Sequence, residues 1–265
     1  MKKSGMQTSP TTRGLIIAAG QGTRLSAQAD LKPLIRIRGV PLIQRVIEQG
    51  VNAGLCEFYV TVGYQHQRLE EFLVQLREQL GVAITTIHNP HWQLGNGSSV
   101  LAARAHLEPP FVLMMADHLI EPRLVRTLTA HSLARDQVML AVDRDLDNSW
   151  VDLDDVTRVR TREGRIKAIG KQLSDFDCYD TGVFHCSAGL FDALQVSARA
   201  GRHNLSDAIQ TLADQGLVST VDIQGAFWID IDSPNMMALA EQWLQNPRNP
   251  APAAVHLDQN REAKG

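Results

Sequence analysis

Five residues of a loop near the start of the chain combine an accessible backbone with a hydroxyl and two cations: Gly20, Gly22, Thr23, Arg24 and Lys32. The apolar run 15–19 precedes them and predicts a buried strand that ends at the glycines. Because glycine carries no side chain, the backbone there can bend sharply and approach a ligand closely. Uncovered N–H groups beside two fixed cations suit a polyphosphate. The loop therefore predicts a site for a nucleoside triphosphate.

Two better-known phosphate-binding loops do not match this segment. The dinucleotide fingerprint requires a third glycine where Leu25 stands, with a helix directly after it. The Walker loop requires Gly-Lys-Ser/Thr after four spacer residues, and the segment has no such sequence. A dinucleotide-dependent oxidoreductase is therefore disfavoured, and a strand–loop turn with a surface arginine is the non-functional interpretation.

Three carboxylates follow apolar, strand-like runs. Asp117 comes directly after residues 111–116, and Asp230 and Asp232 come at the end of residues 227–231. Ligands of an open parallel sheet bind beyond the carboxyl ends of its strands, and strand alternation puts Asp230 and Asp232 on one face. Mg²⁺ is typically held by one or two carboxylates together with phosphate oxygens. These residues predict a metal–nucleotide site, while a helix cap explains any one of them alone.

The remaining polar candidates lie in other loops and strand ends. The segment 95–99, Gly-Asn-Gly-Ser-Ser, precedes a predicted helix, and free N–H groups there favour an anion or a base edge. Its candidate nucleotide contacts are Gly95, Asn96 and Ser98. Lys171 ends a strand before a polar loop and is a candidate contact for the phosphate of a second substrate. The candidate contacts for that acceptor are His118, Asp180 and Thr181.

The order of the predicted elements favours an α/β fold. Strands at 15–19, 57–62 and 82–87 alternate with helices at 41–52 and 69–80, which predicts a parallel sheet covered by helices. Later strands are expected at 111–115, 138–142, 156–160, 165–169, 181–184, 218–223 and 227–231, and helices from 98, 121, 204 and 233. The short strands between 156 and 184 are expected to be antiparallel. Residues 13–245 form one predicted domain, flanked by disordered residues 1–12 and 246–265.

Composition excludes several classes of function. The 265 residues are 44% hydrophobic and 21% charged with a net charge of −3, so no basic footprint indicates nucleic acid. The three cysteines have no metal-type spacing. Residues 1–12 lack the apolar core of a signal peptide, and the longest apolar run, 111–116, is too short to span a membrane. We expect a soluble, cytoplasmic protein.

The combined motifs resemble the nucleoside-diphosphate-sugar pyrophosphorylase type of nucleotidyltransferase over most of the chain. The resemblance is carried by A-A-G-x-G-T-R-L…K-P-L, by Gly95-Asn96-Gly97, by the strand that ends in Asp117 and by W-I-D-I-D from Trp228. Within this superfamily the chain is most similar to the CTP:inositol-1-phosphate cytidylyltransferases. That similarity is carried by G-N-G-S-S, M-A-D-H, W-I-D-I-D-S and the run R-I-K-A-I-G-K-Q-L-S-D-F-D-C-Y-D-T-G-V-F.

The resemblance implies a Rossmann-like nucleotidyltransferase fold, with a mixed, mostly parallel central sheet flanked by helices and a small antiparallel acceptor-binding part. It also implies Mg²⁺-dependent transfer of CMP from CTP to inositol 1-phosphate, with release of pyrophosphate. The matching positions are the nucleotide contacts Ala18, Ala19, Gly20 and Gly22, the phosphate-contacting cations Arg24 and Lys32, the metal ligands Asp117 and Asp230 or Asp232, and the acceptor-phosphate lysine Lys171. Family members are often fused to a membrane phosphotransferase that consumes CDP-inositol; because this sequence has no membrane segment, we expect a separate protein in that role.

Two alternatives stay open at the level of sequence. The first keeps the fold but uses a sugar 1-phosphate, phosphocholine or a phosphonate as acceptor, with CTP, UTP or dTTP. A phosphocholine site requires an aromatic or acidic cage, for which only Trp92, Trp150 and Tyr179 are candidates. The second is a non-catalytic nucleotide sensor, which the presence of both Arg24 and Asp117 disfavours.

Overall fold

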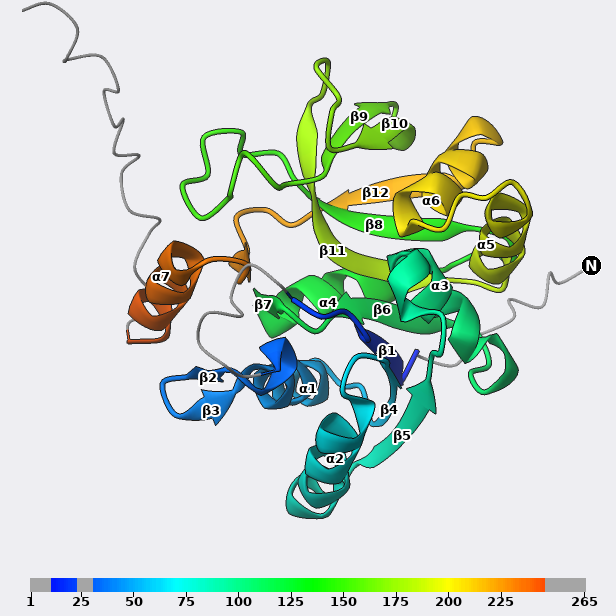
Figure 1. Cartoon of the computed structure of the whole chain (residues 1–265). Helices are drawn as coiled ribbons and strands as arrows, with labels where there is room; N and C mark the ends of the chain where they lie inside the picture. The colour runs from blue at the N-terminus through cyan, green and yellow to red at the C-terminus, as the bar shows by residue number, and fades with distance from the viewer. Residues whose placement is uncertain (1–10, 23–30, 246–265) are drawn as a thin grey trace, which may run out of the picture.

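A nine-stranded sheet runs through the centre of the molecule and mixes strands from both halves of the chain (Figure 1). The computed structural model describes residues 11–22 and 31–245. The strand order is β5-β4-β1-β6-β11-β8-β12-β10-β9. The bounds are β1 (Arg13–Ala18), β4 (Glu57–Val62), β5 (Ala83–His88), β6 (Phe111–Met115), β8 (Val138–Asp143), β9 (Arg158–Arg162), β10 (Arg165–Gly170), β11 (Cys178–Cys186) and β12 (Val218–Asp222).

The N-terminal half of the chain forms the parallel part of this sheet. β5, β4, β1 and β6 are parallel neighbours, as the alternation of strand and helix predicts. β1 is buried almost throughout because its apolar run is covered by helices on both faces. The carboxyl ends of β1 and β6 meet at one edge, where the loops after both strands begin.

β11 joins the parallel part to the remaining strands. Near its end it runs antiparallel to β6, near its start antiparallel to β9, and along its other side antiparallel to β8. β11 spans Cys178–Cys186, so the predicted strand 181–184 was too short. The prediction fell short because Asp180 and Gly182 interrupt the apolar pattern. The strand continues past them with an irregular register between Asp180 and Phe184.

The sheet is mixed, as predicted, although its antiparallel share is larger than expected. Among the described strands, four pairings of the central sheet are parallel and five are antiparallel. The difference arises because β11 runs against both of its central neighbours. The β9–β10 hairpin, which turns at Glu163 and Gly164, adds a further antiparallel pair.

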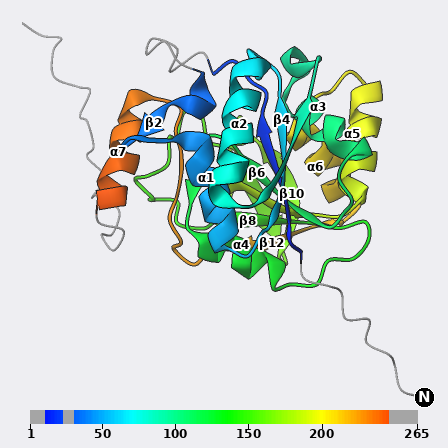
Figure 2. The same ribbon diagram turned by 90° about the horizontal axis from the view of Figure 1, so that it is seen from below.

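Helices cover both faces of the sheet in three layers (Figure 2). α1, α2 and α4 pack on one face and α3, α5 and α6 on the other, and neighbouring strand residues such as Ile16 and Leu15 point to opposite layers. The bounds are α1 (Leu42–Asn52), α2 (His66–Leu80), α3 (Asn96–Ala102), α4 (Pro122–Thr129), α5 (Gly189–Arg199), α6 (Leu205–Asp214) and α7 (Pro234–Gln245). No element was predicted over α5, although its buried Leu190, Phe191 and Leu194 have helical spacing.

Two small sheets and α7 build a third apolar cluster beside the main sheet. The small sheets pair β2 (Arg36–Ile37) with β3 (Val40–Pro41), and β7 (His118–Ile120) with β13 (Trp228–Asp230). α7 begins after Ser233, whose Oγ accepts a hydrogen bond from Met236 N at 3.3 Å, as expected for a capping serine. Trp243 of α7 stacks on Phe227 with ring centroids 3.8 Å apart. This cluster fixes the segment that leads into Asp230 and Asp232.

Two residues of the predicted disordered N-terminus already contact the fold. Thr11 Oγ1 lies 2.8 Å from His185 Nε2, and Thr12 O accepts a hydrogen bond from Cys56 N at 2.9 Å. The remaining residues predicted to be disordered, 1–10 and 246–265, lie outside the described residues. Within the described part of the chain, no helix has the length and apolar character of a membrane span.

Candidate active site

The β7–β13 pair brings three predicted site residues together outside the central sheet. His118 lies opposite Asp230 in this antiparallel pair, and Asp117 O accepts a hydrogen bond from Ile231 N at 2.9 Å. The sequence predicted the strand before Asp230 among those of the main sheet, which is wrong. It leaves that sheet because β7, directly after Asp117, supplies a different pairing edge. The pairing nevertheless places Asp230 beside Asp117 and His118.

Lys32 lies between two of the predicted metal carboxylates. Its Nζ is 2.7 Å from Asp117 Oδ2 and also contacts Asp232 Oδ1, and only 8% of the residue is exposed. The aliphatic part of Lys32 packs on Gly22, where an added Cβ would come within 2.6 Å of Lys32 Cβ. Gly22 also has a φ of +64°, in the left-handed region. Glycine is therefore required at position 22 for Lys32 to reach the carboxylates.

His118 adds a second positive charge to this cluster. Its Nδ1 lies 2.8 Å from Asp117 Oδ1 and 3.8 Å from Asp230 Oδ1. Burial acts to lower the pKa of His118, but the charge of Asp230 and the hydrogen bond to Asp117 outweigh it and raise the pKa to about 9. Without a bound metal ion, the imidazole therefore carries a proton at neutral pH.

The two central carboxylates differ in their preference for a proton. Burial acts to raise the pKa of Asp117, but the charge of Lys32 and the hydrogen bond from His118 hold it well below its usual range. For Asp230, burial prevails over the charge of His118, and the pKa rises to about 6. Asp117 is thus ionised at any working pH, whereas Asp230 takes up a proton in mild acid.

The donor set fits a divalent cation. Ligand atoms of Asp117, His118 and Asp230 lie within 4.8 Å of one another, and so do those of Asp155, Asp230 and Asp232. The buried Oδ1 of Asp230 has no hydrogen-bond partner within the part of the chain that the structure describes. Hard carboxylate oxygens are the ligands that Mg²⁺ prefers. Asp117, Asp230 and Asp232 would hold such an ion.

Two cavities lie on either side of Asp117 and Asp232, the residues that line both. The smaller cavity, about 290 Å³, borders the glycine loop and is also lined by Ala18, Gly20, Gly22 and Lys32. The larger cavity, about 560 Å³, lies towards β10, β11 and α6 and includes Asn96, His118, Asp155, Lys171, Asp180, Asn204 and Asp230. Two molecules placed in these cavities would meet at the carboxylates.

The predicted acceptor residues differ in where they lie. Lys171 lines the larger cavity, and its Nζ bonds Asp155 Oδ1 at 2.6 Å. Asp180 lines it too and accepts a hydrogen bond from Gly182 N at 2.7 Å, while burial raises its pKa to about 6. Thr181 is fully buried and donates its hydroxyl to Ala141 O at 2.9 Å. The proposed acceptor contact of Thr181 has no support, because strand alternation turns it away from Asp180.

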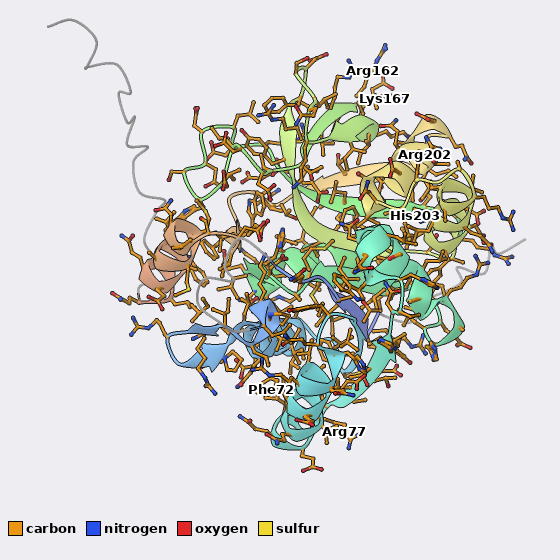
Figure 3. The ribbon with its side chains drawn as sticks, in the orientation of Figure 1. Phe72, Arg77, Arg162, Lys167, Arg202 and His203 are labelled. Atoms are coloured by element: carbon orange, nitrogen blue, oxygen red, sulfur yellow. The ribbon has the colours of Figure 1, made fainter. Side chains whose placement is uncertain are left out.

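The segment 95–99 packs against the residues before α6. A Cβ at Gly95 would lie 2.8 Å from His203 O, and Figure 3 shows His203 beside α3. Ser98 donates its hydroxyl to Gly95 O at 2.7 Å and lines neither of these two cavities but a third one beside His91 and His203, so its role as a nucleotide contact stays a prediction. Asn96 lines the larger cavity, and its Oδ1 accepts a hydrogen bond from Leu205 N at 2.8 Å.

The other predicted nucleotide contacts near the glycine loop are Ala18, Ala19, Thr23 and Arg24. Thr23 and Arg24 lie outside the described residues, so their roles remain predictions. Ala18 lines the smaller cavity, whereas Ala19 is buried and its carbonyl accepts a hydrogen bond from Tyr64 N at 2.9 Å.

Sequence reasoning missed Asp155 and the support given by Trp228. Asp155 sits in an irregular loop between β8 and β9, where no strand end or motif marks it. Trp228 stacks against His118, with ring centroids 6.3 Å apart, and donates its Nε1 to Asp143 Oδ2 at 2.8 Å. The available signal for the contact between Trp228 and His118 was an aromatic residue two positions before Asp230 in an apolar strand.

Comparison with known families identifies the class of protein that carries this site. A model of the MobA-like NTP transferase domain matches residues 14–262. The chain belongs to this family. As a MobA-like NTP transferase it is an enzyme, a nucleotidyltransferase, in agreement with the prediction from the glycine loop and the strand-end carboxylates.

Curated relatives of this MobA-like NTP transferase carry a second activity. The bifunctional IPC transferase and DIPP synthase of Rubrobacter xylanophilus is 33% identical over 249 residues, which cover 92% of this chain and 55% of the relative. The protein of the same name from Archaeoglobus fulgidus is 27% identical over 232 residues, covering 88% and 44%. The chain thus spans about half the length of these relatives.

Solved structures confirm the predicted nucleotidyltransferase fold. The inositol-1-phosphate CTP transferase from T. maritima has a TM-score of 0.79 at 23% identity, covering 92% of this chain and 99% of that one. A UDP-glucose pyrophosphorylase complexed with UDP-glucose has a TM-score of 0.74 at 19% identity, covering 90% of this chain and 100% of that one. The MobA-like NTP transferase therefore shares its fold with both enzymes.

Proposed function

We propose that the protein transfers CMP from CTP to inositol 1-phosphate, giving CDP-inositol and pyrophosphate. The arrangement of two cavities that share Asp117 and Asp232 carries this proposal. The names of the relatives, IPC transferase and inositol-1-phosphate CTP transferase, support the choice of base and acceptor. On this proposal the reaction occurs in the cytoplasm and its product serves phospholipid biosynthesis.

The smaller cavity suits the triphosphate of CTP. Its glycines expose backbone to the ligand and Lys32 supplies a positive charge at its wall. Arg24, in the loop outside the described residues, is proposed as a second phosphate contact. Bound Mg²⁺ at Asp117 with Asp230 or Asp232 would neutralise phosphate oxygens as charge develops.

The larger cavity suits a phosphorylated polyol. Lys171 offers an ammonium group to the acceptor phosphate, and Asp180 offers a carboxylate to hydroxyl groups. Asn96 lines the same wall, where its amide can orient the ring. His118 reduces repulsion between this acceptor and the carboxylate cluster, because it carries a positive charge beside Asp117 and Asp230.

The chemistry requires no nucleophile or strong base from the protein. A phosphate oxygen of the acceptor, already an anion, forms a bond to the α-phosphorus of CTP, and the bond to the oxygen that bridges the α- and β-phosphorus breaks. Pyrophosphate leaves with that electron pair. The protein contributes by holding two polyanions in line and by placing cations where charge accumulates.

The test is release of pyrophosphate in the presence of Mg²⁺, with each of the four common NTPs combined with inositol 1-phosphate, glucose 1-phosphate or phosphocholine. We expect release only with CTP and inositol 1-phosphate, and a product with the mass of CDP-inositol. Release with any other pair alone would contradict the proposed substrates.

A sugar-1-phosphate uridylyltransferase is the second candidate, favoured by the structural similarity to UDP-glucose pyrophosphorylase. The same grid separates it, since it predicts release with UTP and glucose 1-phosphate. CTP binding without release for any acceptor would favour a nucleotide sensor over both enzymes.

A further inference from the structure

Lys32 stands between two of the three carboxylates that would hold a divalent cation. Its ammonium group contacts Oδ2 of Asp117 and Oδ1 of Asp232, the two carboxylates at the junction of the cavities. Mg²⁺ approaches its oxygen ligands to about 2.0–2.1 Å and demands near-octahedral geometry. An ammonium group between the same two oxygens therefore excludes the ion sterically and by like charge.

We infer that Lys32 acts as an internal counter-cation that occupies the metal position until a triphosphate draws it away, so that metal binds tightly only together with nucleotide. This inference rests on the nucleotide site of the proposed function. It adds an order of events to that site and gives Lys32 two successive partners, first the carboxylates and then the phosphate.

The surroundings of Lys32 permit this exchange. Lys32 also lines the smaller cavity with Gly20 and Gly22, so a triphosphate bound there meets the ammonium group directly. The side chain is a flexible four-carbon chain with a single charge at its end, and a small rotation changes its partner. When Lys32 leaves, the partly buried carboxylates of Asp117 and Asp232 lose the ammonium group between them, which opens the position to a metal ion.

Lys171 provides a matched comparison within the same cluster. It is also an ammonium group bonded to a carboxylate, Asp155 Oδ1 at 2.6 Å, but it does not lie between Asp117 and Asp232. Removing its charge takes one partner from Asp155, whose ligand atom lies within 4.8 Å of those of Asp230 and Asp232, but leaves Lys32 in place between Asp117 and Asp232.

The experiment measures Mn²⁺ binding to the nucleotide-free full-length chain by electron paramagnetic resonance of the free ion. Wild type, Lys32→Met and Lys171→Met are compared, after circular dichroism has shown that each is folded. We expect Lys32→Met to bind Mn²⁺ about ten-fold or more tightly than wild type, because a competing charge has been removed from between the ligands. Lys171→Met should stay within about three-fold of wild type.

A second measurement needs only the wild-type chain. Trp228 stacks on His118 and Trp150 lines a cavity with Asp232, so Mn²⁺ bound at Asp117 and Asp232 should quench part of the emission of the four tryptophans. We expect little quenching by Mn²⁺ alone and strong quenching once inorganic tripolyphosphate is added.

Equal Mn²⁺ affinity of wild type and Lys32→Met, or the same quenching by Mn²⁺ with and without tripolyphosphate, would overturn the inference. Neither measurement uses CTP or inositol 1-phosphate. A wrong base or acceptor in the proposed function therefore leaves both results unchanged.

Discussion

Gly182 lies against His118 so closely that a side chain does not fit between them. An added Cβ at Gly182 would lie 2.8 Å from His118 Cδ2, and the φ of Gly182 is +76°. His118 in turn contacts Asp117 at 2.8 Å. The conformation of one glycine in β11 therefore determines where the imidazole meets the carboxylate cluster.

This relationship predicts that Gly182→Ala impairs catalysis beyond its effect on stability. Gly201 is the matched control, because its φ of +73° is similar and a Cβ there meets nothing within 4 Å. Each alanine should cost about 1–2 kcal/mol of unfolding free energy for the left-handed backbone. Only Gly182→Ala should lower kcat, which steady-state kinetics will test. Equal kcat for both variants would show that the position of His118 is unimportant.

Asp117→Asn should lower kcat by about two to three decades, the scale of one lost electrostatic group. The substitution keeps the shape of the side chain but removes the charge that pairs with Lys32 and His118. Pyrophosphate release measures the loss, with the exposed Asp154→Asn as control. A folded Asp117→Asn variant with near wild-type turnover would contradict the metal assignment. The same loss is predicted for Arg24→Ala.

Thr181→Val and Asp180→Asn should separate structure from acceptor binding at adjacent positions. Thr181→Val leaves Ala141 O without its donor and should lower the unfolding free energy by about 1–3 kcal/mol, with an unchanged KM for the acceptor. Asp180→Asn should raise that KM several-fold because Asp180 lines the cavity. Thermal denaturation and acceptor titrations distinguish the two; a raised acceptor KM for Thr181→Val would restore its predicted role.

The raised pKa of Asp180 predicts a stability effect that depends on pH. Since its folded-state pKa of about 6 lies above the value of about 3.9 in the unfolded chain, ionisation costs the folded state free energy. That cost is full above pH 6, declines as the pH falls through 6, and is absent below about 4. Asp180→Asn should therefore raise Tm at pH 8 and have little effect at pH 4. An equal shift at both values would exclude the ionisation of Asp180 as its cause.

Lys171→Met should weaken the acceptor alone. Its ammonium group lines only the larger cavity, so we expect the KM for inositol 1-phosphate to rise about ten-fold or more, as expected for a charged hydrogen bond, and the KM for CTP to stay constant. Asp155→Asn should raise the KM for inositol 1-phosphate to a smaller extent, since it removes the carboxylate charge that holds Lys171 in place. An equal rise for both substrates would place Lys171 on the nucleotide side instead.

The sequence was most informative where local pattern and tertiary environment agree. β4 begins and ends where the alternating apolar residues predicted, and Asp117 follows β6 as expected of a carboxylate at the end of a buried strand. β11 was underestimated because Asp180 and Gly182 are polar or small for reasons of the site rather than of the sheet. Residues that line a cavity break the apolar period, and this hides the strand that carries them.

Long-range contacts explain what the sequence could not predict in the candidate site. Lys32 reaches Asp232 across 200 positions, and no spacing rule marks such a pair. Asp155 comes from an irregular loop, and Ser98 lines a different cavity from Asn96, two positions before it in α3. The residue types indicated a metal–nucleotide site. Which of these side chains line the cavities depends on the direction in which each one points from its helix or strand.

The two cavities have consequences for how this enzyme can change over time. Among the described residues, only Asp117 and Asp232 line both cavities, so residues of the larger cavity that do not contact the carboxylate cluster can vary without changing the wall of the smaller one. Mutations in β10, β11 and the start of α6 can therefore explore new acceptors while the nucleotide half stays intact. Because the sheet divides at β11, the choice of acceptor can change in evolution while the choice of nucleotide stays the same.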